Sequence, residues 1–345
     1  MLTERRTLSV FMGNYNHAHY ISEALESILS QSFMPTEITI VDDASTDNSI
    51  EVIKGFAKRY SNVRLVQNTS NTRGRACAQV ISRALIQGEA DYVYLAAADD
   101  KVLPGFFEKS IGLLERYPQA GLCATYPKFM DAQGNFIKRE KLPFFHTHET
   151  HIHIKRSTFL SPAEVLSRLR RQPWFIRGFV SVLFRRSVLA EVWGLIPELG
   201  VLSDGFALDF VALKYGMCYI PEPLVAFRIM PNSLGANIVL QPRVAMDEFV
   251  RIFRLMRETK YRQVFPKSFI DKKRQEFTYT SFRGALVLWQ TNFLQELHNL
   301  VPPKSLLAKG IMCLLHILMR FQWLMLKVYC YGNIAPIFKE DHPMR

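Results

Sequence analysis

Short apolar runs alternate with segments of helical periodicity through roughly the first 100 residues of this chain. Leu8–Met12 is a continuous apolar run, which is typical of a strand buried on both faces of a parallel sheet. Apolar residues recur at helical spacing in His19–Gln31, so this segment is predicted to be a helix. Further apolar runs at Glu37–Val41, Val63–Val66 and Tyr92–Leu95 are separated by two more helical patterns. This alternation predicts a doubly wound parallel α/β sheet.

The alternation continues less regularly to about residue 236, where the pattern changes. Beyond that point the sequence shows long helical patterns at roughly 242–260, 266–298 and 304–330. We therefore expect two domains, at 1–235 and 236–345. The later elements predicted for the first domain are a helix after Pro104, strands at Leu122–Tyr126, Gly178–Phe184 and Met217–Ile220, helices at Ser187–Trp193 and Asp204–Tyr215, and a turn at Asp131–Asn135.

Composition and charge exclude several classes of protein. Of the 345 residues, 48% are hydrophobic, which is enough for a sizeable core and too many for a disordered chain. The formal net charge of +12 favours anionic partners, namely nucleotides, nucleic acids or a membrane surface. The sequence has no zinc-finger spacing or RNP-like motif, so we do not expect nucleic-acid binding. It has no GxGxxG after the first apolar run, which argues against a dinucleotide-dependent oxidoreductase.

Acidic pairs follow two of the predicted strands. Asp42-Asp43 comes after the second apolar run, and Asp99-Asp100 follows the fourth. Ligands of open α/β sheets bind at the carboxyl ends of the strands, and carboxylate oxygens suit Mg²⁺ or Mn²⁺. Each pair can instead cap the following helix, while Tyr15, after the first strand, packs on its neighbours. Since the ring of Tyr15 can also stack on a nucleobase, the combination favours a cation-assisted site for a phosphorylated ligand.

Seven segments, taken in order, resemble the family-2 glycosyltransferases of the GT-A fold. They span about residues 7–235. The resemblance implies a Rossmann-like mixed sheet flanked by helices, followed here by a C-terminal helical extension. It also implies a sugar transferase of the bacterial surface-polysaccharide type. The matching segments are SVFMGNYNHAHYISEALESILSQSF, EITIVDDASTDNS, NTRG, GEADYVYLAAADD, FVSVLFRRSVLAEVWG, LSDGFALDF and IPEPLVAFRIMPNS.

The resemblance implies roles for the acids that follow the strands. Asp43 resembles the acid that recognises the base of the donor nucleotide, with Asp42 beside it, and Tyr15 resembles the residue next to that base. Asp99 resembles the acid that contacts the ribose and shares the metal, and Asp100 resembles the metal ligand on the diphosphate. The implied cofactor is a divalent cation, Mn²⁺ or Mg²⁺, and the implied donor is a nucleotide-diphospho-sugar, expected to be a UDP-sugar.

Asp204 lies at the start of a predicted helix, where a carboxylate either caps the helix or faces a ligand. The resemblance implies that it is the general base of an inverting transferase. It would deprotonate an acceptor hydroxyl, which attacks the anomeric carbon of a hexosyl or N-acetylhexosaminyl donor. The acceptor is expected to be a saccharide or a polyprenyl-linked saccharide. A non-catalytic GT-A-like scaffold in a membrane-bound glycan assembly complex is the alternative.

Three departures from the family pattern involve four residues, of which Ala97, Gln79 and Val80 motivate the scaffold alternative. Ala97 stands where the family often has an acid two positions before the acidic pair. Ser203 stands where an acid usually precedes the base, so a supporting carboxylate is missing. Gln79-Val80 replaces a frequent Arg-Asn, so a contact to the diphosphate or the sugar is in doubt.

Arginines elsewhere can supply the missing contact. Either Arg73 or Arg75, in the segment TRGR, replaces the lost arginine at the diphosphate, or the donor sugar is an unusual one. Arg228, in FRIMPNS, is a further candidate for that contact, and a solvated turn is an equally good interpretation. The His146–His153 segment carries four histidines, for which a mobile loop beside the acceptor site is favoured over a zinc site.

The C-terminal segment 304–330 is predicted to be an amphipathic helix. Its uninterrupted apolar run is too short for a membrane span. A narrow basic stripe opposite Trp and Phe slightly favours a helix lying in the inner-membrane surface over one packed on the catalytic domain or a partner subunit. Five cysteines without a CxxC pair indicate reduced thiols, so we expect a cytoplasmic protein, peripheral at the cytoplasmic face of that membrane. The stripe consists of Lys309, His316, Arg320 and Lys327.

Overall fold

The computed structural model describes residues 6–72, 74–138, 154–171, 178–193, 203–230 and 242–278. The chain divides into two compact units, Met1–Met230 and Pro231–Arg345. The sequence placed the change of pattern at residue 236, and that stretch lies outside the described residues. Each unit is described by itself below.

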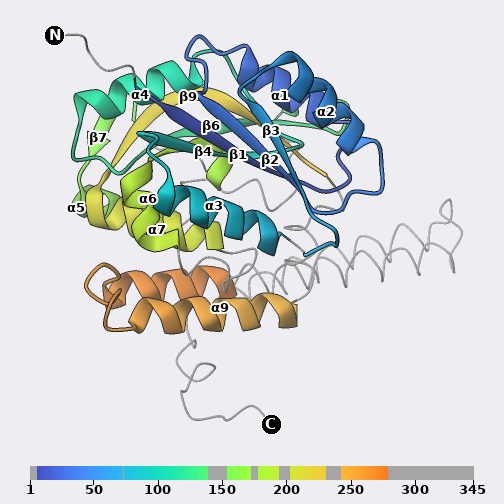
Figure 1. The fold of residues 1–345 in the computed structure, drawn as a ribbon. Helices are drawn as coiled ribbons and strands as arrows, with labels where there is room; N and C mark the ends of the chain where they lie inside the picture. The colour runs from blue at the N-terminus through green and yellow to red at the C-terminus, as the bar shows by residue number, and fades with distance from the viewer. Residues whose placement is uncertain are drawn as a thin grey trace, which may run out of the picture. The chain divides into compact units, whose positions relative to one another are not determined.

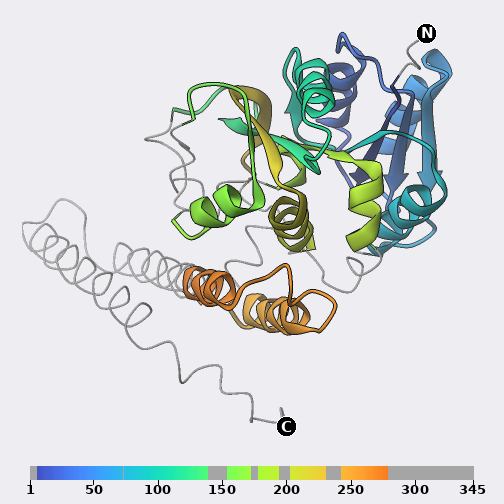
Figure 2. The same ribbon diagram turned by 90° about the vertical axis from the view of Figure 1, so that its left-hand side faces the viewer.

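The N-terminal unit is built on one nine-stranded sheet with the order β3-β2-β1-β4-β8-β6-β9-β5, to which β7 is added alongside β9. Figures 1 and 2 show α1, α2 and α4 on one face of the sheet and α3, α6 and α7 on the other. The strands are β1 (Leu8–Asn14), β2 (Glu37–Asp42), β3 (Val63–Gln67), β4 (Tyr92–Ala97), β5 (Lys101–Val102), β6 (Leu122–Met130), β7 (Thr158–Leu160), β8 (Val182–Arg185) and β9 (Met217–Arg228). The helices are α1 (Ile21–Leu29), α2 (Ser49–Arg59), α3 (Arg75–Gln87), α4 (Phe106–Arg116), α5 (Pro162–Leu169), α6 (Arg186–Trp193) and α7 (Ser203–Tyr215).

The sheet is mixed, as the resemblance implied, whereas the alternation of strands and helices taken alone predicted a parallel sheet. β1 pairs in parallel with β2 and β4, and β2 with β3, as the alternation predicted. β8 instead runs antiparallel to both β4 and β6. The chain enters β8 through a short 3-10 turn, Phe179–Ser181, which follows Gly178 at a positive φ of 67°. The predicted strand Gly178–Phe184 is therefore a turn followed by a shorter strand.

β9 is longer than predicted, because it continues through two prolines. The sequence indicated a strand that ends at Ile220, before Pro221 and Pro223, yet β9 runs on to Arg228. Its pairing with β6 shifts register on either side of Tyr126, opposite this stretch. An irregular register tolerates proline, which has no N–H for the ladder.

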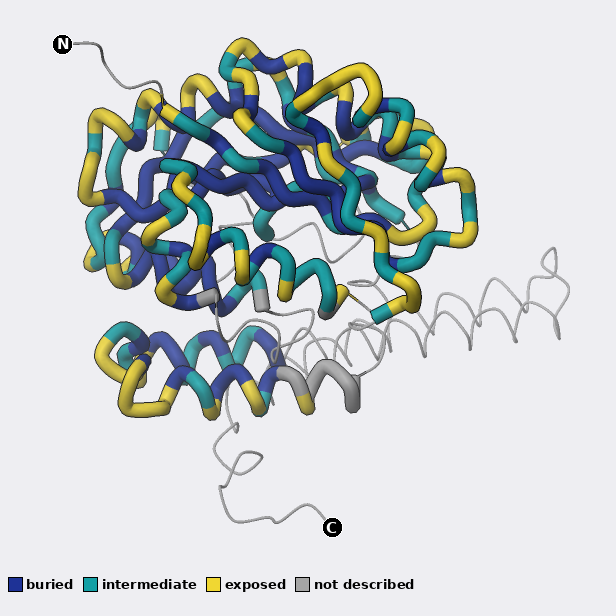
Figure 3. Tube along the Cα trace, viewed as in Figure 1, coloured by how far each residue is buried: buried dark blue, intermediate teal, exposed yellow. Residues whose placement is uncertain are grey.

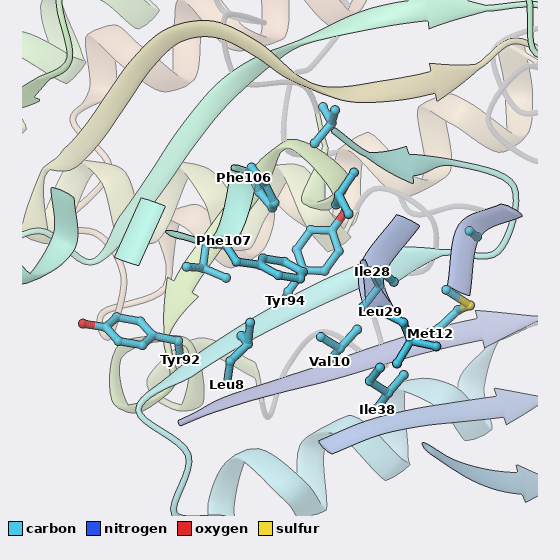
Figure 4. Packing of buried hydrophobic residues seen from close by; sticks show 14 of the residues in the cluster. Leu8, Val10, Met12, Ile28, Leu29, Ile38, Tyr92, Tyr94, Phe106 and Phe107 are labelled. Carbon is cyan, nitrogen blue, oxygen red and sulfur yellow. The ribbon is translucent and has the colours of Figure 1, made fainter. Parts of the chain in front are cut away.

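The core lies between the sheet and the helices that cover it. Val10 of β1 is fully buried, and Ile28 of α1 is almost completely so, in the apolar stripe that the helical spacing predicted. Tyr94 of β4 packs edge to face against Phe106 and Phe107 of α4, with ring centroids 5.3 Å apart in both pairs. Figure 4 shows these side chains converging above β1 and β4, and Figure 3 shows buried residues following the central strands.

The C-terminal unit is helical where it is described. It contains α9 (Pro242–Arg257) and a second helix that begins at 267 and continues to 278, the end of the described range. Phe249 stacks on Phe277 with centroids 4.1 Å apart and ring planes 17° apart. In the part of the chain that the structure describes, no helix has the length and apolarity needed to cross a bilayer. The predicted helix 304–330 lies outside that part.

The close approach of Gly121 to α7 yields a test of this packing. A methyl group at Gly121 would lie 2.6 Å from Cγ1 of Val211 and 3.1 Å from Cβ of Tyr215. We expect Gly121→Ala to lower the free energy of unfolding by about 1–3 kcal/mol, as overpacked cores do. Gly55→Ala is the control: nothing lies within 4 Å of the added methyl group, and the residue is inside α2. Urea titration should show that Gly55→Ala raises the free energy of unfolding by about 0.5–1 kcal/mol. Equal midpoints for Gly121→Ala and the unmodified chain would contradict this packing.

Candidate active site

The carboxyl ends of β1, β2 and β4 meet at one edge of the sheet. Asn14 of β1 lies opposite Asp42 of β2, and Gly13 lies opposite Ala97 of β4. Because the three strands are parallel and adjacent, the residues that follow them leave the sheet from the same edge. Tyr15, Asp43 and the Asp99-Asp100 pair are therefore brought to one side of the molecule.

Asp42 closes the turn after β2. It is fully buried, and its Oδ2 accepts hydrogen bonds from Nδ2 of Asn14 at 2.7 Å and from the hydroxyl of Ser45 at 2.6 Å. Its Oδ1 accepts from the backbone N–H of Ser45 at 2.9 Å. Between them, Ala44 has a positive φ of 63°. Asp42 thus joins the ends of β1 and β2 and shapes the turn that presents Asp43.

Asp43 organises the loop between β3 and α3. Its Oδ1 accepts from Nδ2 of Asn68 at 2.9 Å and from the hydroxyl of Thr72 at 2.7 Å. The backbone N–H groups of Thr72 and Gly74 also donate to this carboxylate, at 3.0 and 2.9 Å. Burial raises the pKa of Asp43, but the hydrogen bonds from Gly74 and Thr72 outweigh it, so the pKa lies below its usual value. Sequence reasoning missed Asn68 and Thr72, for which the Asn- and Thr-rich run 68–72 was the available signal.

Tyr15 follows β1 with 43% of its side chain exposed, which leaves its ring accessible for stacking. The next residue, Asn16, has a positive φ of 55°, and its Oδ1 accepts from the backbone N–H of Thr46 at 2.7 Å. This bond ties the loop after β1 to the loop after β2. Arg73 lies outside the described residues, and Arg75 begins α3 with a side chain that is not described.

The Asp99-Asp100 pair lies in the connection between β4 and β5. Asp100 is 7% exposed, and its Oδ1 accepts from the backbone N–H of Arg228 at 2.7 Å. Burial, and then the charge of Asp99, hold the pKa of Asp100 well above its usual value. Asp100 does not cap α4, whose N-cap is Gly105.

A divalent cation fits this pair. Among the described residues no group of three or more His, Cys, Asp and Glu side chains is placed to hold a metal. Mg²⁺ and Mn²⁺ sites that also bind phosphates need only one or two carboxylates, since water and phosphate oxygens complete the shell. Burial and the charge of Asp99 both raise the pKa of Asp100, and a cation bound at this pair would offset both effects.

Asp204 reaches the same edge of the sheet from α7. Its Oδ1 accepts from the backbone N–H of Gly205 at 2.6 Å, and its Oδ2 lies 3.3 Å from the position that a Cβ would occupy at Gly178. Gly178 leads into β8, where Leu183 lies opposite Tyr94 of β4. The hydroxyl of Tyr94 donates to the carbonyl of Val180 at 3.0 Å. The turn that touches Asp204 is therefore attached to the strand that leads to Asp99.

Arg228 is placed differently from the sequence expectation. It is 3% exposed, and its guanidinium binds backbone carbonyls and Glu23. These contacts bind the guanidinium to the protein itself and do not present it to a diphosphate. The His146–His153 segment lies outside the described residues.

Residues 9–193, more than half of the chain, match the family model for glycosyl transferase family 2. The chain belongs to this family. EpsE of Bacillus subtilis (strain 168), named as a glycosyltransferase, is 37% identical over 128 residues, which cover 37% of this chain and 45% of EpsE. A poly(ribitol-phosphate) beta-glucosyltransferase of Bacillus spizizenii is 33% identical over 98 residues, or 28% of this chain and 15% of that one. The matched regions thus span less than half the length of these two relatives.

Solved structures establish the fold. A crystal structure of S. aureus TarS 1-349 gives a TM-score of 0.52 at 14% identity, covering 94% of this chain and 81% of that one. The mannosyltransferase PcManGT from Pyrobaculum calidifontis gives 0.53 at 16% identity, covering 95% and 86%. At such identities the likeness concerns the fold alone, and it confirms the GT-A architecture expected from the sequence.

The hydrogen bonds to Asp43 predict a pH-dependent contribution to stability. Asn at this position keeps one acceptor and faces the donors of Thr72 and Gly74 with an amide N–H₂, so we expect Asp43→Asn to cost about 1–3 kcal/mol at pH 7. Because the pKa of Asp43 is lowered by folding, its contribution is complete above the unfolded pKa, about 3.9, and is lost as the pH falls through the folded value.

Urea titrations between pH 3 and pH 7 measure this effect. The difference in the free energy of unfolding between Asp43→Asn and the unmodified chain should become smaller as the pH falls below about 4. The matched control is Asp247→Asn, at an exposed position of α9. A difference that stays constant across this range would contradict the assignment of an ionised, hydrogen-bonded Asp43.

Proposed function

We propose that this chain is an inverting glycosyltransferase that moves a sugar from a nucleotide-diphospho-sugar to a hydroxyl of a saccharide or lipid-linked saccharide. One observation carries the proposal. Asp43 and the Asp99-Asp100 pair follow β2 and β4, the parallel strands on either side of β1, at one edge of the sheet, and Asp204 lies against the turn that leads into β8, the other neighbour of β4. The names of the similar proteins support a role in surface-polysaccharide synthesis.

The donor side of the site is formed by the loops after β1, β2 and β4. The base would lie between the exposed ring of Tyr15 and the loop that Asp43 organises. TarS 1-349 has been crystallised with UDP, and PcManGT with GDP-Man and Mn²⁺. We favour a UDP-sugar of the hexose or N-acetylhexosamine type, with Arg73 and Arg75 near the diphosphate.

Asp99 and Asp100 would hold the divalent cation. Mn²⁺ or Mg²⁺ bound there neutralises charge on the departing nucleoside diphosphate. Asp100 is held by a backbone hydrogen bond through Oδ1, and in the described part of the chain Oδ2 accepts no hydrogen bond. One carboxylate oxygen is thereby fixed while the other stays available.

Asp204 would act as the general base. Its carboxylate would take the proton of the acceptor hydroxyl, whose oxygen then attacks the anomeric carbon from the side opposite the diphosphate. The hydrogen bond from Gly205 orients one carboxylate oxygen. A polyprenyl-linked acceptor would place the protein at the cytoplasmic face of the inner membrane, and this location is part of the proposal.

Removing the base tests the mechanism directly. Asp204→Asn should reduce transfer from a UDP-sugar by about 10²–10⁴-fold, the usual contribution of general-base catalysis. Binding of the same UDP-sugar with Mn²⁺, measured by thermal shift, should be retained, because the donor contacts are elsewhere. Asp247→Asn should behave like the unmodified chain in both assays. Undiminished transfer by Asp204→Asn would exclude Asp204 as the base, whereas no transfer by the unmodified chain would favour the non-catalytic scaffold.

Gly178 offers a second test of the position of Asp204. Alanine there would bring a methyl group to 3.3 Å from Oδ2 of Asp204, at a residue with a φ of 67°. We expect at least a tenfold loss of transfer, since small displacements of catalytic groups are costly. Gly105→Ala is the control, because Gly105 also has a positive φ, 87°, but the atoms nearest to an added Cβ there belong to the side chain of Lys109.

Both glycine variants should lose unfolding free energy in urea. The loss should be about 1–2 kcal/mol for Gly105→Ala, in a left-handed conformation, and about 1–3 kcal/mol for Gly178→Ala, whose φ of 67° and ψ of 173° are adopted essentially by glycine alone. Their transfer rates should differ, because only the Gly178 variant disturbs Asp204. Equal rates in the two variants would place Asp204 outside the reacting centre.

A further inference from the structure

Arg228 lies at the end of β9, directly against the Asp99-Asp100 connection. β5 and β9 pair antiparallel with Lys101 opposite Ala226, so Arg228 lies alongside the connection that precedes β5. The backbone N–H of Arg228 donates to Oδ1 of Asp100 at 2.7 Å, and its Nε donates to the carbonyl of Asp99 at 2.8 Å. A single residue therefore holds both acids, one through its main chain and one through its side chain.

The guanidinium also holds the turn that follows β6. Its Nη1 donates to the carbonyls of Asp131 and Ala132, both at 3.1 Å. Oδ1 of Asp131 closes that turn by accepting from the backbone N–H groups of Gln133 at 3.0 Å and Asn135 at 2.8 Å. The predicted turn at 131–135 is confirmed, and two of its carbonyls, those of Asp131 and Ala132, face the arginine.

Helix α1 supplies the remaining partners of the guanidinium. Its Nη2 forms an ion pair with Glu23, which also pairs with Lys101 of β5. The ring of Tyr20 lies under the guanidinium, whose central carbon is 4.6 Å from the ring centroid. Burial raises the pKa of Glu23, but the hydrogen bonds and charges of Lys101 and Arg228 outweigh it, so the pKa is lowered and Glu23 stays ionised.

We propose that Arg228 and Glu23 are positioning residues that set the Asp99-Asp100 connection in the geometry a divalent cation requires. This inference rests on the proposed function. A buried guanidinium is costly unless its donors are paired, and here Asp99, the 131–135 turn and Glu23 pair them. The guanidinium of Arg228 links its own strand, β9, to the Asp99-Asp100 connection, the 131–135 turn and α1. The two acids therefore have little freedom to move. Outer partners of metal ligands typically contribute about 10–100-fold to metal affinity.

Arg185 provides a matched control at the opposite edge of the sheet. Its Nε donates to the carbonyl of Ala120 at 2.9 Å, and its Nη2 donates to the carbonyl of Leu114. Arg185 lies opposite Tyr92, the first residue of β4, whereas Asp99 comes after the last residue of that strand. Arg185 thus serves backbone carbonyls as Arg228 does, but away from the acidic pair.

The experiment measures Mn²⁺ binding to the full chain saturated with UDP, by isothermal titration calorimetry. We expect Arg228→Gln to bind Mn²⁺ about 10–100-fold more weakly. Arg185→Gln should stay within about twofold of the unmodified chain, even though both variants melt at lower temperature. UDP binding without metal should be unchanged in Arg228→Gln, which separates a metal effect from general loss of structure.

Glu23→Gln is the second variant, and it tests the inference in the event that Arg228→Gln does not fold. It keeps a hydrogen-bond acceptor but removes the charge that holds Nη2, so we expect about tenfold weaker Mn²⁺ binding, the low end of the same range. Its control is Glu191→Gln, since Glu191 pairs with Lys214 and Tyr215 far along the chain.

Three results overturn the inference or its basis. Unchanged Mn²⁺ affinity in Arg228→Gln overturns the positioning role, as does an equal loss in Arg185→Gln. An unmodified chain that binds UDP equally with and without Mn²⁺ overturns the proposed metal site itself. The last result is seen before any variant is made, so the two failures are distinguishable.

Discussion

Parallel pairing of β1 with β2 and β4 is the constraint on which the site depends. Three adjacent strands that point the same way must deliver their next residues to one edge, and helices must return the chain across the faces. The apolar run of β1 can be buried this way, because β2 and β4 satisfy its backbone groups. The arrangement has a free-energy cost at that edge, because three acidic side chains, those of Asp42, Asp43 and Asp100, are buried there. Each of these acids must find donors or positive charge there.

Asp43 and Asp100 meet that requirement in opposite ways. Both are less than 10% exposed, so burial raises the pKa of each. At Asp43, donors from Asn68, Thr72 and Gly74 outweigh burial and lower the pKa. At Asp100, a single backbone donor faces both burial and the charge of Asp99, and the pKa stays high. The first carboxylate is already satisfied by the protein, whereas the second is suited to an external cation.

The sequence predicted the part of the fold that depends on local pattern. Apolar runs and helical spacing located β1 to β4 and α1 to α4, because a buried strand and an amphipathic helix each carry their own periodicity. The direction of β8 was missed, since strand polarity depends on how the chain enters the sheet. β5 and β7, of two and three residues, are too short to show any period.

The positions of the acids at the strand ends could be predicted from the sequence, but their hydrogen-bond and ion-pair partners could not. The strand-end positions of Asp43 and Asp99 follow from the pattern, but the donors to Asp43 come from a loop about 30 residues away. Glu23 and Arg228 are 205 residues apart, and no periodic signal links them. From the sequence, Arg228 was a candidate for a contact to the diphosphate, with a solvated turn as an equally good interpretation. The structure shows that its donors are taken by the protein.

The two halves of the proposed reaction rest on different elements. The donor side depends on the edge formed by β1, β2 and β4, which the parallel pairing and the partners of Asp42 and Asp43 hold in place. The base belongs to α7 and is located by a contact with Gly178, whose chain is attached to β4 through Tyr94 and Val180. Loss of the base therefore need not disturb the donor loops. Because the Asp99-Asp100 pair follows β4 and that turn is attached to β4, this strand would hold the donor side and the base of the proposed reaction in register.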